Sequence, residues 1–245
     1  RNCLTQLVDE NSIGSQLFNF RFEGEDELGG HNLGNLILYG LGKVQSSPMD
    51  SIKLVRRLLR VRTQVLPMSE TPTDLMAFYP EGRCRLGELS VDEMPMMPTD
   101  LMLAPLVKSV KPCIDAIENA DLIILGPGSF LTSVVPPLLV RDITKALNKR
   151  SGHCVFIDNI VAEQSPAAKL TLDEKLDWIE SNIGCLPIDS VICQDKEIHS
   201  DRVNVFCQDL AHNKVPHHHD NEKLIHALET CVRNISKTSN IEIAS

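Results

Sequence analysis

Apolar residues recur with two different periods along this chain. In the first 60 residues they return every three or four positions, which is the period of an amphipathic helix. This pattern predicts helices over residues 1–20 with a break at 11–14, over 27–45, and from Pro48 to about Arg60. Pro48 suits the first turn of its helix, because that position needs no backbone N–H donor.

The pattern changes between residues 61 and 107. Short β-like runs alternate there with turn signals, and five prolines between Pro67 and Pro98 exclude long helices. The runs are Thr63–Met68, Leu75–Tyr79, Arg83–Leu89 and Leu101–Val107. The pair Glu81-Gly82 predicts a hairpin turn. We therefore expect residues 61–107 to form a small antiparallel insertion.

Beyond residue 107, short apolar runs alternate with amphipathic stretches. The expected strands are 121–125, Val155–Asp158, Ile188–Cys193 and Val203–Phe206. The expected helices are 112–119, 142–149, Thr171–Asn182 and 221–234, with Asp142 and Asp220 as N-caps of two of them. Alternating strands and helices predict a mostly parallel sheet with right-handed crossovers. The fold class is therefore α/β.

The segment Asp121–Ser129 carries the strongest functional signal. Its apolar run ends in Gly126-Pro127-Gly128-Ser129, and the residues that follow can begin a helix. Ligands of parallel sheets bind at the carboxyl ends of strands, and free N–H groups at a helix start attract anions. The hydroxyl groups of Ser129, Thr132 and Ser133 can add hydrogen bonds. This predicts a phosphate or carboxylate site, and the alternative is a tight turn whose hydroxyls only cap the helix.

A second group of polar residues surrounds Gly34. On a helix, His31, Asn32 and Asn35 share one arc, opposite Leu33, Leu36 and Ile37. Carboxamides both donate and accept hydrogen bonds, which suits sugar hydroxyls or the edge of a base. Asn159 follows a strand and is expected at the same sheet edge as the turn. The alternative for the helix is a solvated face or a locally satisfied helix end.

Other candidates carry weaker signals. Arg1 and Asn2 can contact phosphate, although a solvated chain end is the alternative. Glu70 and Asp74 follow the first β-like run, where they stabilise a turn or hold a ribose hydroxyl or metal. The run His217-His218-His219 is rich in metal-ligand types. Because side chains alternate in direction along an extended segment, three consecutive histidines are not expected to bind one metal, and we expect no metal site.

Composition limits the function classes. The chain of 245 residues is 42% hydrophobic, enough for a sizeable core, and its net charge of −9 disfavours nucleic acid or anionic membranes as partners. No apolar run approaches the roughly 20 residues of a membrane span. Eight scattered cysteines without a CxxC motif are typical of reduced thiols in a cytoplasmic protein. The first residue is Arg1, so we expect an upstream portion to be missing.

Four motifs in order along the chain resemble those of one family. Residues 120–140, ADLIILGPGSFLTSVVPPLLV, resemble the GPGS-x-x-TS-x-x-P-x-LLV signature of the bacterial gluconeogenesis factors, the YvcK-type proteins. HNLGNL at His31–Leu36 resembles their GHNxGN helix. RNCL at the start resembles the end of their GD-x-RNCL motif, and Pro67-Met68-Ser69-Glu70 matches their PM-S/T-D/E motif. The shorter enterobacterial-type branch is the most similar.

The resemblance implies a three-layer Rossmann-like fold, with the whole of 1–245 forming one domain of the CofD-like superfamily. It implies a nucleotide or nucleotide-sugar ligand and a cytoplasmic role in carbon-source adaptation and in cell shape or envelope metabolism. The family's Gly-rich first strand-helix units would lie upstream of Arg1. Relatives often carry Arg-His-Asp before the last helix, where this chain has His218 in place of the arginine.

Three hypotheses follow. The first is a regulatory protein that binds a UDP-sugar-like ligand and supports gluconeogenic growth, with no turnover. The second is a CofD-like transferase that moves a phospholactyl or similar phospho-acyl group to a deazaflavin, with Mg²⁺ as the expected metal. The CofD enzyme carries a GPSNP-like turn where this chain has Gly126-Pro127-Gly128-Ser129-Phe130, which counts against this hypothesis. The third is a non-catalytic binder of an NAD-like dinucleotide. A homodimer is expected in each case.

Overall fold

The computed structural model describes residues 2–8, 12–24, 27–44 and 47–243, and these form two compact units. The first unit is Arg1–Thr71 with Ser109–Cys113, and the second is Pro72–Lys108 with Ile114–Ser245. Each unit is described by itself below. None of the helices in the described part of the chain is both long and apolar enough to cross a membrane.

The first unit is helical. Its helices are α1 (Asn2–Gln6), α2 (Ile13–Asn19), α3 (Leu33–Val44) and α4 (Pro48–Leu58). Pro48 begins α4 as predicted, and the hydroxyl of Ser47 accepts the N–H of Asp50. The core of the unit consists of Leu4, Phe18, Val55, Leu59 and Val61. The prediction of a strand over Thr63–Met68 is wrong, because this segment pairs with no strand and its Val65 packs on the helical core.

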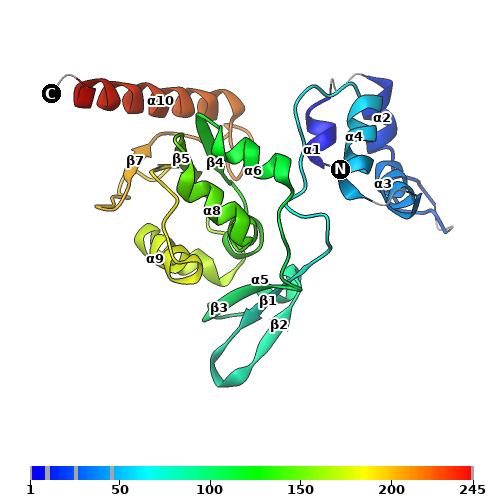
Figure 1. Ribbon diagram of the computed structural model, residues 1–245, viewed down its shortest axis with the longest axis horizontal. Helices are drawn as coiled ribbons and strands as arrows, with labels where there is room; N and C mark the ends of the chain where they lie inside the picture. The colour runs from blue at the N-terminus through cyan, green and yellow to red at the C-terminus, as the bar shows by residue number, and fades with distance from the viewer. Residues whose placement is uncertain (1, 9–11, 25–26, 45–46, 244–245) are drawn as a thin grey trace. The chain divides into compact units, whose positions relative to one another are not determined.

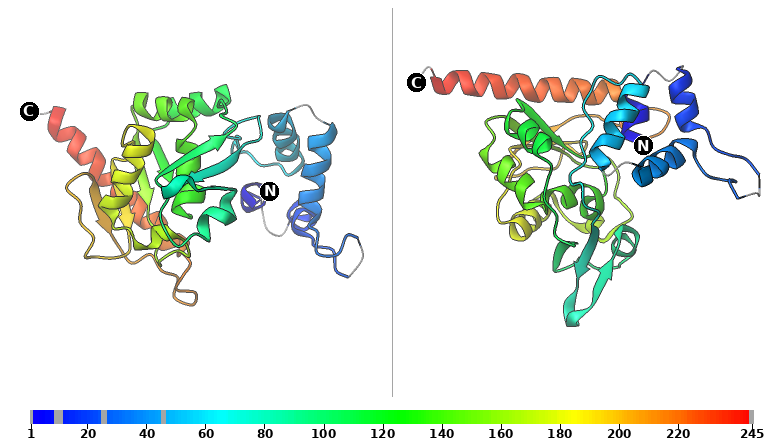
Figure 2. Two further views of the ribbon diagram at one scale, coloured as in Figure 1. Left: turned by 90° about the horizontal axis from the view of Figure 1, so that it is seen from below. Right: turned by 45° about the vertical axis from the view of Figure 1, so that its right-hand side comes forward.

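The second unit contains two sheets (Figures 1 and 2). The antiparallel one has the order β2-β1-β3 and consists of β1 (Asp74–Phe78), β2 (Cys84–Leu86) and β3 (Asp100–Ala104). Glu81 and Gly82 have φ values of 64° and 73°, which makes the predicted hairpin turn between β1 and β2. A short helix, α5 (Glu88–Asp92), follows β2. The run predicted to Val107 ends as a strand at Ala104, directly before Pro105, which has no N–H to donate to a ladder.

The parallel sheet has the order β4-β5-β6-β7. Its strands are β4 (Leu122–Leu125), β5 (His153–Ile157), β6 (Ser190–Cys193) and β7 (Asn204–Cys207). The predicted α/β fold, with a parallel sheet and a smaller antiparallel one, is confirmed. Strands β5 and β6 are almost fully buried, as expected for strands covered on both faces.

Helices cover this sheet. Helix α6 (Lys111–Glu118) precedes β4. Between β4 and β5 lie η2 (Phe130–Val134), α7 (Val135–Leu138) and α8 (Arg141–Lys149), and between β5 and β6 lie η3 (Pro166–Lys169) and α9 (Leu172–Ile183). Helix α10 (Asn221–Ile243) follows β7, and its Ala227 and Cys231 pack on Val155, Ile157 and Ile192. Asp220 caps α10 as predicted. Asp142 does not cap α8; it lies in the first turn, because the helix already begins at Arg141.

Candidate functional site

The turn after β4 has the shape that its glycines predict. Gly126 has a φ of 77°, and a Cβ there would lie 2.9 Å from the carbonyl oxygen of Ile157 on β5. A side chain at this position would therefore clash with the next strand in a conformation that L-residues rarely adopt. The Gly126–Pro127 peptide is cis. A Cβ on Gly128 would lie 3.0 Å from the Cβ of Ser133. The backbone of the turn therefore packs closely against β5 and Ser133 at the carboxyl edge of the sheet.

The donors of this turn that we expected to bind an anion contact two carboxylates. The hydroxyls of Ser129 and Thr132 donate to Asp92 at 3.1 and 2.8 Å. The N–H of Phe130 donates to both oxygens of Glu163, at 3.1 and 3.4 Å. That the two hydroxyls contact a ligand stays a prediction, since in this structure the protein's own Asp92 accepts their hydrogen bonds. Ser133 is exposed, and its N–H closes the local helical turn on the carbonyl of Ser129.

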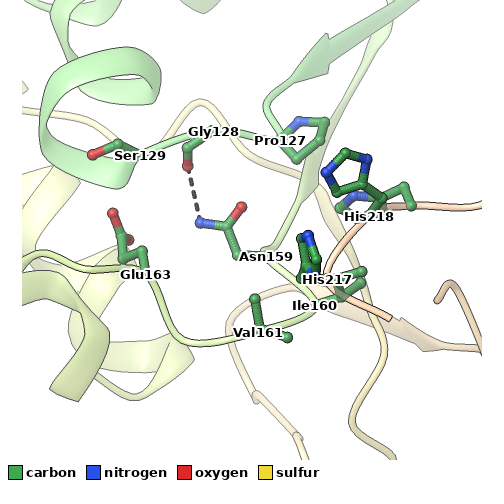
Figure 3. A pocket seen from close by; sticks show the side chains of 10 residues that line it. Pro127, Gly128, Ser129, Asn159, Ile160, Val161, Glu163, His217 and His218 are labelled. Atoms are coloured by element: carbon green, nitrogen blue, oxygen red, sulfur yellow. Dashed lines mark hydrogen bonds between the residues drawn. The ribbon is translucent and has the colours of Figure 1, made fainter. Parts of the chain in front are cut away.

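A pocket of about 470 Å³ opens beside this turn (Figure 3). Its lining comes from three segments: the turn itself, the loop after β5, and the run before α10. The lining residues are Pro127, Gly128, Ser129, Asn159, Ile160, Val161, Glu163, His217, His218 and His219. This volume lies within the range of small-molecule sites. No lysine or arginine belongs to this lining within the part of the chain that the structure describes.

The loop after β5 is anchored at both sides. Asn159 donates from Nδ2 to the carbonyl of Gly128 at 3.0 Å, as Figure 3 shows, so it ties this loop to the turn after β4. Its neighbour Asp158 is 7% exposed and accepts from the Nζ of Lys175 at 2.7 Å. The carboxylate of Asp158 also accepts the N–H of Asn159 at 3.0 Å. The buried ion pair therefore fixes the residue that holds the edge of the pocket.

The three histidines line the same pocket, although the extended geometry we expected would send them in alternate directions. The N–H of His218 donates to the carbonyl of Val215 at 2.9 Å, which closes a β-turn with Pro216 at its second position. Proline favours that position of a turn, so the side chains need not alternate. The rings of His217 and His218 meet edge to face, with centroids 4.7 Å apart. Both are seen on the same side of the pocket in Figure 3.

His219 differs from its two neighbours. Burial lowers its pKa, and a backbone hydrogen bond with Asp158 only partly opposes this effect. Its Nε2 is buried without a hydrogen-bond partner in the described structure. His219 is therefore neutral near pH 7. His217 and His218 are exposed, so a ligand in the pocket can reach their rings. In the described residues, no group of three or more His, Cys, Asp or Glu side chains is placed to hold a metal ion.

The residues around Gly34 belong to the first unit. Helix α3 begins at Leu33, so the prediction that a helix of 27–45 carries His31 and Asn32 on one arc is wrong. Asn32 is 3% exposed and its Oδ1 accepts the N–H of Asn35 at 3.1 Å, which is a helix cap. A Cβ on Gly34 would lie 2.5 Å from the carbonyl oxygen of Phe18, so this glycine serves helix packing. The side chains of His31 and Asn35 are exposed, and a ligand-binding role for them stays a prediction.

Of the remaining candidates, Asn2 and Glu70 belong to the first unit and Asp74 belongs to the second. Asn2 is the first residue of α1, and its carbonyl accepts the hydroxyl of Thr5 at 3.1 Å. Arg1 lies outside the described residues. Glu70 accepts from the hydroxyl of Ser47, and Asp74 opens β1, so both have structural contacts of the kind that turns and strand ends require.

Sequence reasoning missed four residues of this site. Glu163, Ile160 and Val161 lie in the loop after β5, and the rule that ligands bind at the carboxyl ends of strands would have found that loop. Asp92 lies on α5, more than 30 residues before the turn, and the sequence carries no signal that brings it to Ser129.

The family of the chain follows from a match over nearly its whole length. The family model described as "2-phospho-L-lactate transferase CofD" matches residues 1–236. The chain belongs to the CofD family. A Yersinia pestis protein named "Putative gluconeogenesis factor" is 42% identical over 98% of this chain and 80% of its own length. The "Gluconeogenesis factor" of Bacillus subtilis is 31% identical over 81% of this chain and 63% of its own length.

Solved structures agree with this assignment. A crystal structure of a UPF0052 family protein from Bacillus halodurans superposes on this CofD-family chain with a TM-score of 0.83 and 26% identity, over 92% of this chain and 80% of that one. The prediction that this chain is a gluconeogenesis-factor-type member of the CofD superfamily is confirmed.

Proposed function

We propose that this chain binds a nucleotide sugar of the UDP-sugar type at the pocket beside Gly128 and acts as a regulatory protein of gluconeogenic growth and cell-envelope metabolism. The observation that supports the proposal is the convergence of three kinds of group on one cavity of about 470 Å³. The hydrogen-bonding atoms are the backbone N–H groups of the turn and the carboxamide of Asn159. His217 and His218 supply imidazoles, and Pro127, Ile160 and Val161 supply an apolar wall.

Each kind of group matches one part of such a ligand. Within the described structure, the N–H groups of Gly128 and Ser129 have no acceptor from the protein, so they are available to phosphate oxygens. Asn159 uses only its Nδ2 in the contact with Gly128, which leaves its Oδ1 to accept from a sugar hydroxyl or a base. The apolar wall suits the face of a ring. The names of the relatives support the role in gluconeogenic growth.

Calorimetry of the chain with UDP-N-acetylglucosamine tests the ligand. We expect binding that Asn159→Asp weakens at least about five-fold, because a like charge roughly 5 Å from a phosphate costs about 1 to 3 kcal/mol at effective dielectric constants of 80 to 20. Asn148→Asp on α8 is the matched control, since it makes the same charge change on an exposed residue outside the pocket. An absence of heat at millimolar ligand would overturn the proposal, as would equal weakening by both variants.

A CofD-like transferase is the second candidate, because the matching family model carries that description. The residues beside the turn offer two carboxylates, Asp92 and Glu163, but both are engaged by protein donors. They do not form a metal centre in the described structure, and we derive no catalytic step through Mg²⁺. Turnover of a deazaflavin acceptor with a guanylylated phospho-acyl donor would establish this candidate. A thermal-shift ranking with NAD above UDP-sugars would instead favour a dinucleotide ligand.

A further inference from the structure

Two cysteines face each other at the end of the parallel sheet. Cys193 is the last residue of β6 and Cys207 the last residue of β7, and the two are direct partners in the register of these strands. Their Sγ atoms lie 3.2 Å apart. All eight cysteines lie in the described part of the chain and are reduced, and no other pair of them shares such a contact there.

The backbone at this position suits a disulfide. Neighbouring strands lie about 4.8 Å apart, and disulfides join residues whose Cα atoms are about 4.4 to 6.8 Å apart. The two sulfurs must approach by only about 1 Å to reach the bond length of about 2.05 Å. Small rotations of the two side chains can supply this movement without a shift of the strands. We propose that Cys193 and Cys207 form a redox-active dithiol, which a low-molecular-weight disulfide such as oxidised glutathione converts to an intramolecular disulfide.

The two thiols have different access to the oxidant. Cys193 is 1% exposed, and burial, with the hydrogen bond to Cys207 second, raises its pKa far above the ordinary value. Cys207 is only half-buried, so it is the sulfur that a reagent can reach. A buried thiol whose sulfur already touches its partner reacts best in the second, intramolecular step.

The reaction balances in two exchanges. The thiolate of Cys207 attacks one sulfur of oxidised glutathione, so that a mixed disulfide forms and one glutathione leaves as the thiolate. The sulfur of Cys193 then loses its proton and attacks the Cys207 sulfur of the mixed disulfide, which expels the second glutathione. The protein loses two hydrogen atoms in total, and two molecules of reduced glutathione carry them.

Oxidation would also change the neighbouring loop. In the reduced form the thiol of Cys193 donates to the carbonyl of Asp195 at 3.5 Å, and that of Cys207 donates to the carbonyl of Ile198 at 3.6 Å. A disulfide has no S–H group, so both carbonyls lose these donors. The segment Asp195–Ile198 follows β6 at the same edge of the sheet at which Asp158 follows β5. The dithiol is therefore a modification site close to the strand end that carries Asn159.

Thiol mapping of the full chain tests the proposal. The reduced protein is incubated with oxidised glutathione, quenched with acid, alkylated, and digested without reduction for mass spectrometry. We expect a peptide pair linked through Cys193 and Cys207, whereas the exposed Cys3 and Cys84 give only mixed disulfides with glutathione. Cys193→Ser is expected to stop at a mixed disulfide on Cys207, and Cys207→Ser to lose the linked pair. The matched control Cys185→Ser, a partly exposed cysteine outside the pair, keeps it.

A second measurement does not depend on variants that fold. Phenylarsine oxide bridges two thiols that are already close, so the reduced wild-type chain is expected to bind one equivalent and thereby to lose its ability to form the linked pair. The proposal is overturned if Cys193 and Cys207 both remain thiols while the exposed cysteines are glutathionylated. It is equally overturned if the internal disulfide maps to other cysteines.

Discussion

The loss of the buried ion pair between Lys175 and Asp158 is expected to lower the free energy of unfolding by an amount that follows from the structure. Lys175 on α9 is 9% exposed and Asp158 is 7% exposed, and their charged atoms lie 2.7 Å apart. The change Lys175→Met keeps an unbranched side chain of similar length but leaves the carboxylate of Asp158 buried without its cation. Removal of one member of such a pair costs about 3 to 5 kcal/mol in the free energy of unfolding.

Urea denaturation followed by tryptophan fluorescence measures this loss. The chain has a single tryptophan, Trp178, three residues after Lys175 on the same helix. With a denaturant slope of about 2 kcal/mol per molar urea, the midpoint is expected to fall by about 1.5 to 2.5 M. Lys145→Met, at an exposed lysine of α8, is the matched control and should change stability by less than about 0.5 kcal/mol.

The double variant separates a lost ion pair from lost packing. Asp158→Asn with Lys175→Met removes both charges, and most of the stability lost by Lys175→Met is expected to return, because the main cost of the single change is the unpaired carboxylate. The reasoning would be refuted by a loss below about 1 kcal/mol for Lys175→Met, or by a double variant no more stable than the single one.

Three further predictions concern other positions. Gly152→Ala should destabilise the second unit by about 3 kcal/mol in urea denaturation, because the new Cβ would lie 1.9 Å from the carbonyl oxygen of Ala120. The control is Gly40→Ala on α3, where a Cβ meets open space, and it should instead stabilise the chain by up to about 1 kcal/mol. Burial lowers the pKa of His153 in the folded chain, so the unfolded chain binds more protons, and the free energy of unfolding should fall as the pH drops below about 6.5. The wild-type urea midpoint should therefore be lower at pH 5.5 than at pH 7.5, and a His153→Gln variant that shows the same full difference would contradict this. Glu163→Gln should tighten binding of UDP-N-acetylglucosamine about five-fold or more in calorimetry, since it removes a negative charge beside the N–H of Phe130, and unchanged affinity would argue against a ligand phosphate at that N–H group.

The parallel sheet was predictable because its strands are short apolar runs, and the two central ones, β5 and β6, are almost fully buried. The same signal failed at Thr63–Met68, where the apolar run is short but Val65 packs on a helical core instead of facing a second strand. Local periodicity describes which residues are buried, and it does not say whether a helix or a strand covers them. The start of α3 was also placed wrongly, because the cap at Asn32 was treated as part of the helix.

The candidate site was predictable where one segment contains the whole signal. The turn at Gly126 needs a glycine for its own backbone, and the sequence shows it. At the histidine run the expected extended geometry is wrong, because Pro216 favours a turn there and the turn replaces it. Asp92 and Glu163 reach the turn from separate elements, and their contacts depend on tertiary packing that no local pattern records.

The position of Asp92 has a consequence for attempts to trim this protein. Asp92 is the last residue of α5, the short helix that follows β2. One of its carboxylate oxygens accepts the hydroxyl of Ser129 and the other accepts that of Thr132. A shortened version in which residues 72–108 are replaced by a linker would retain every strand of the parallel sheet. It would nevertheless remove the carboxylate that holds the hydroxyls of Thr132 and of Ser129, and Ser129 lines the pocket, so a minimal version must keep the small sheet and its helix.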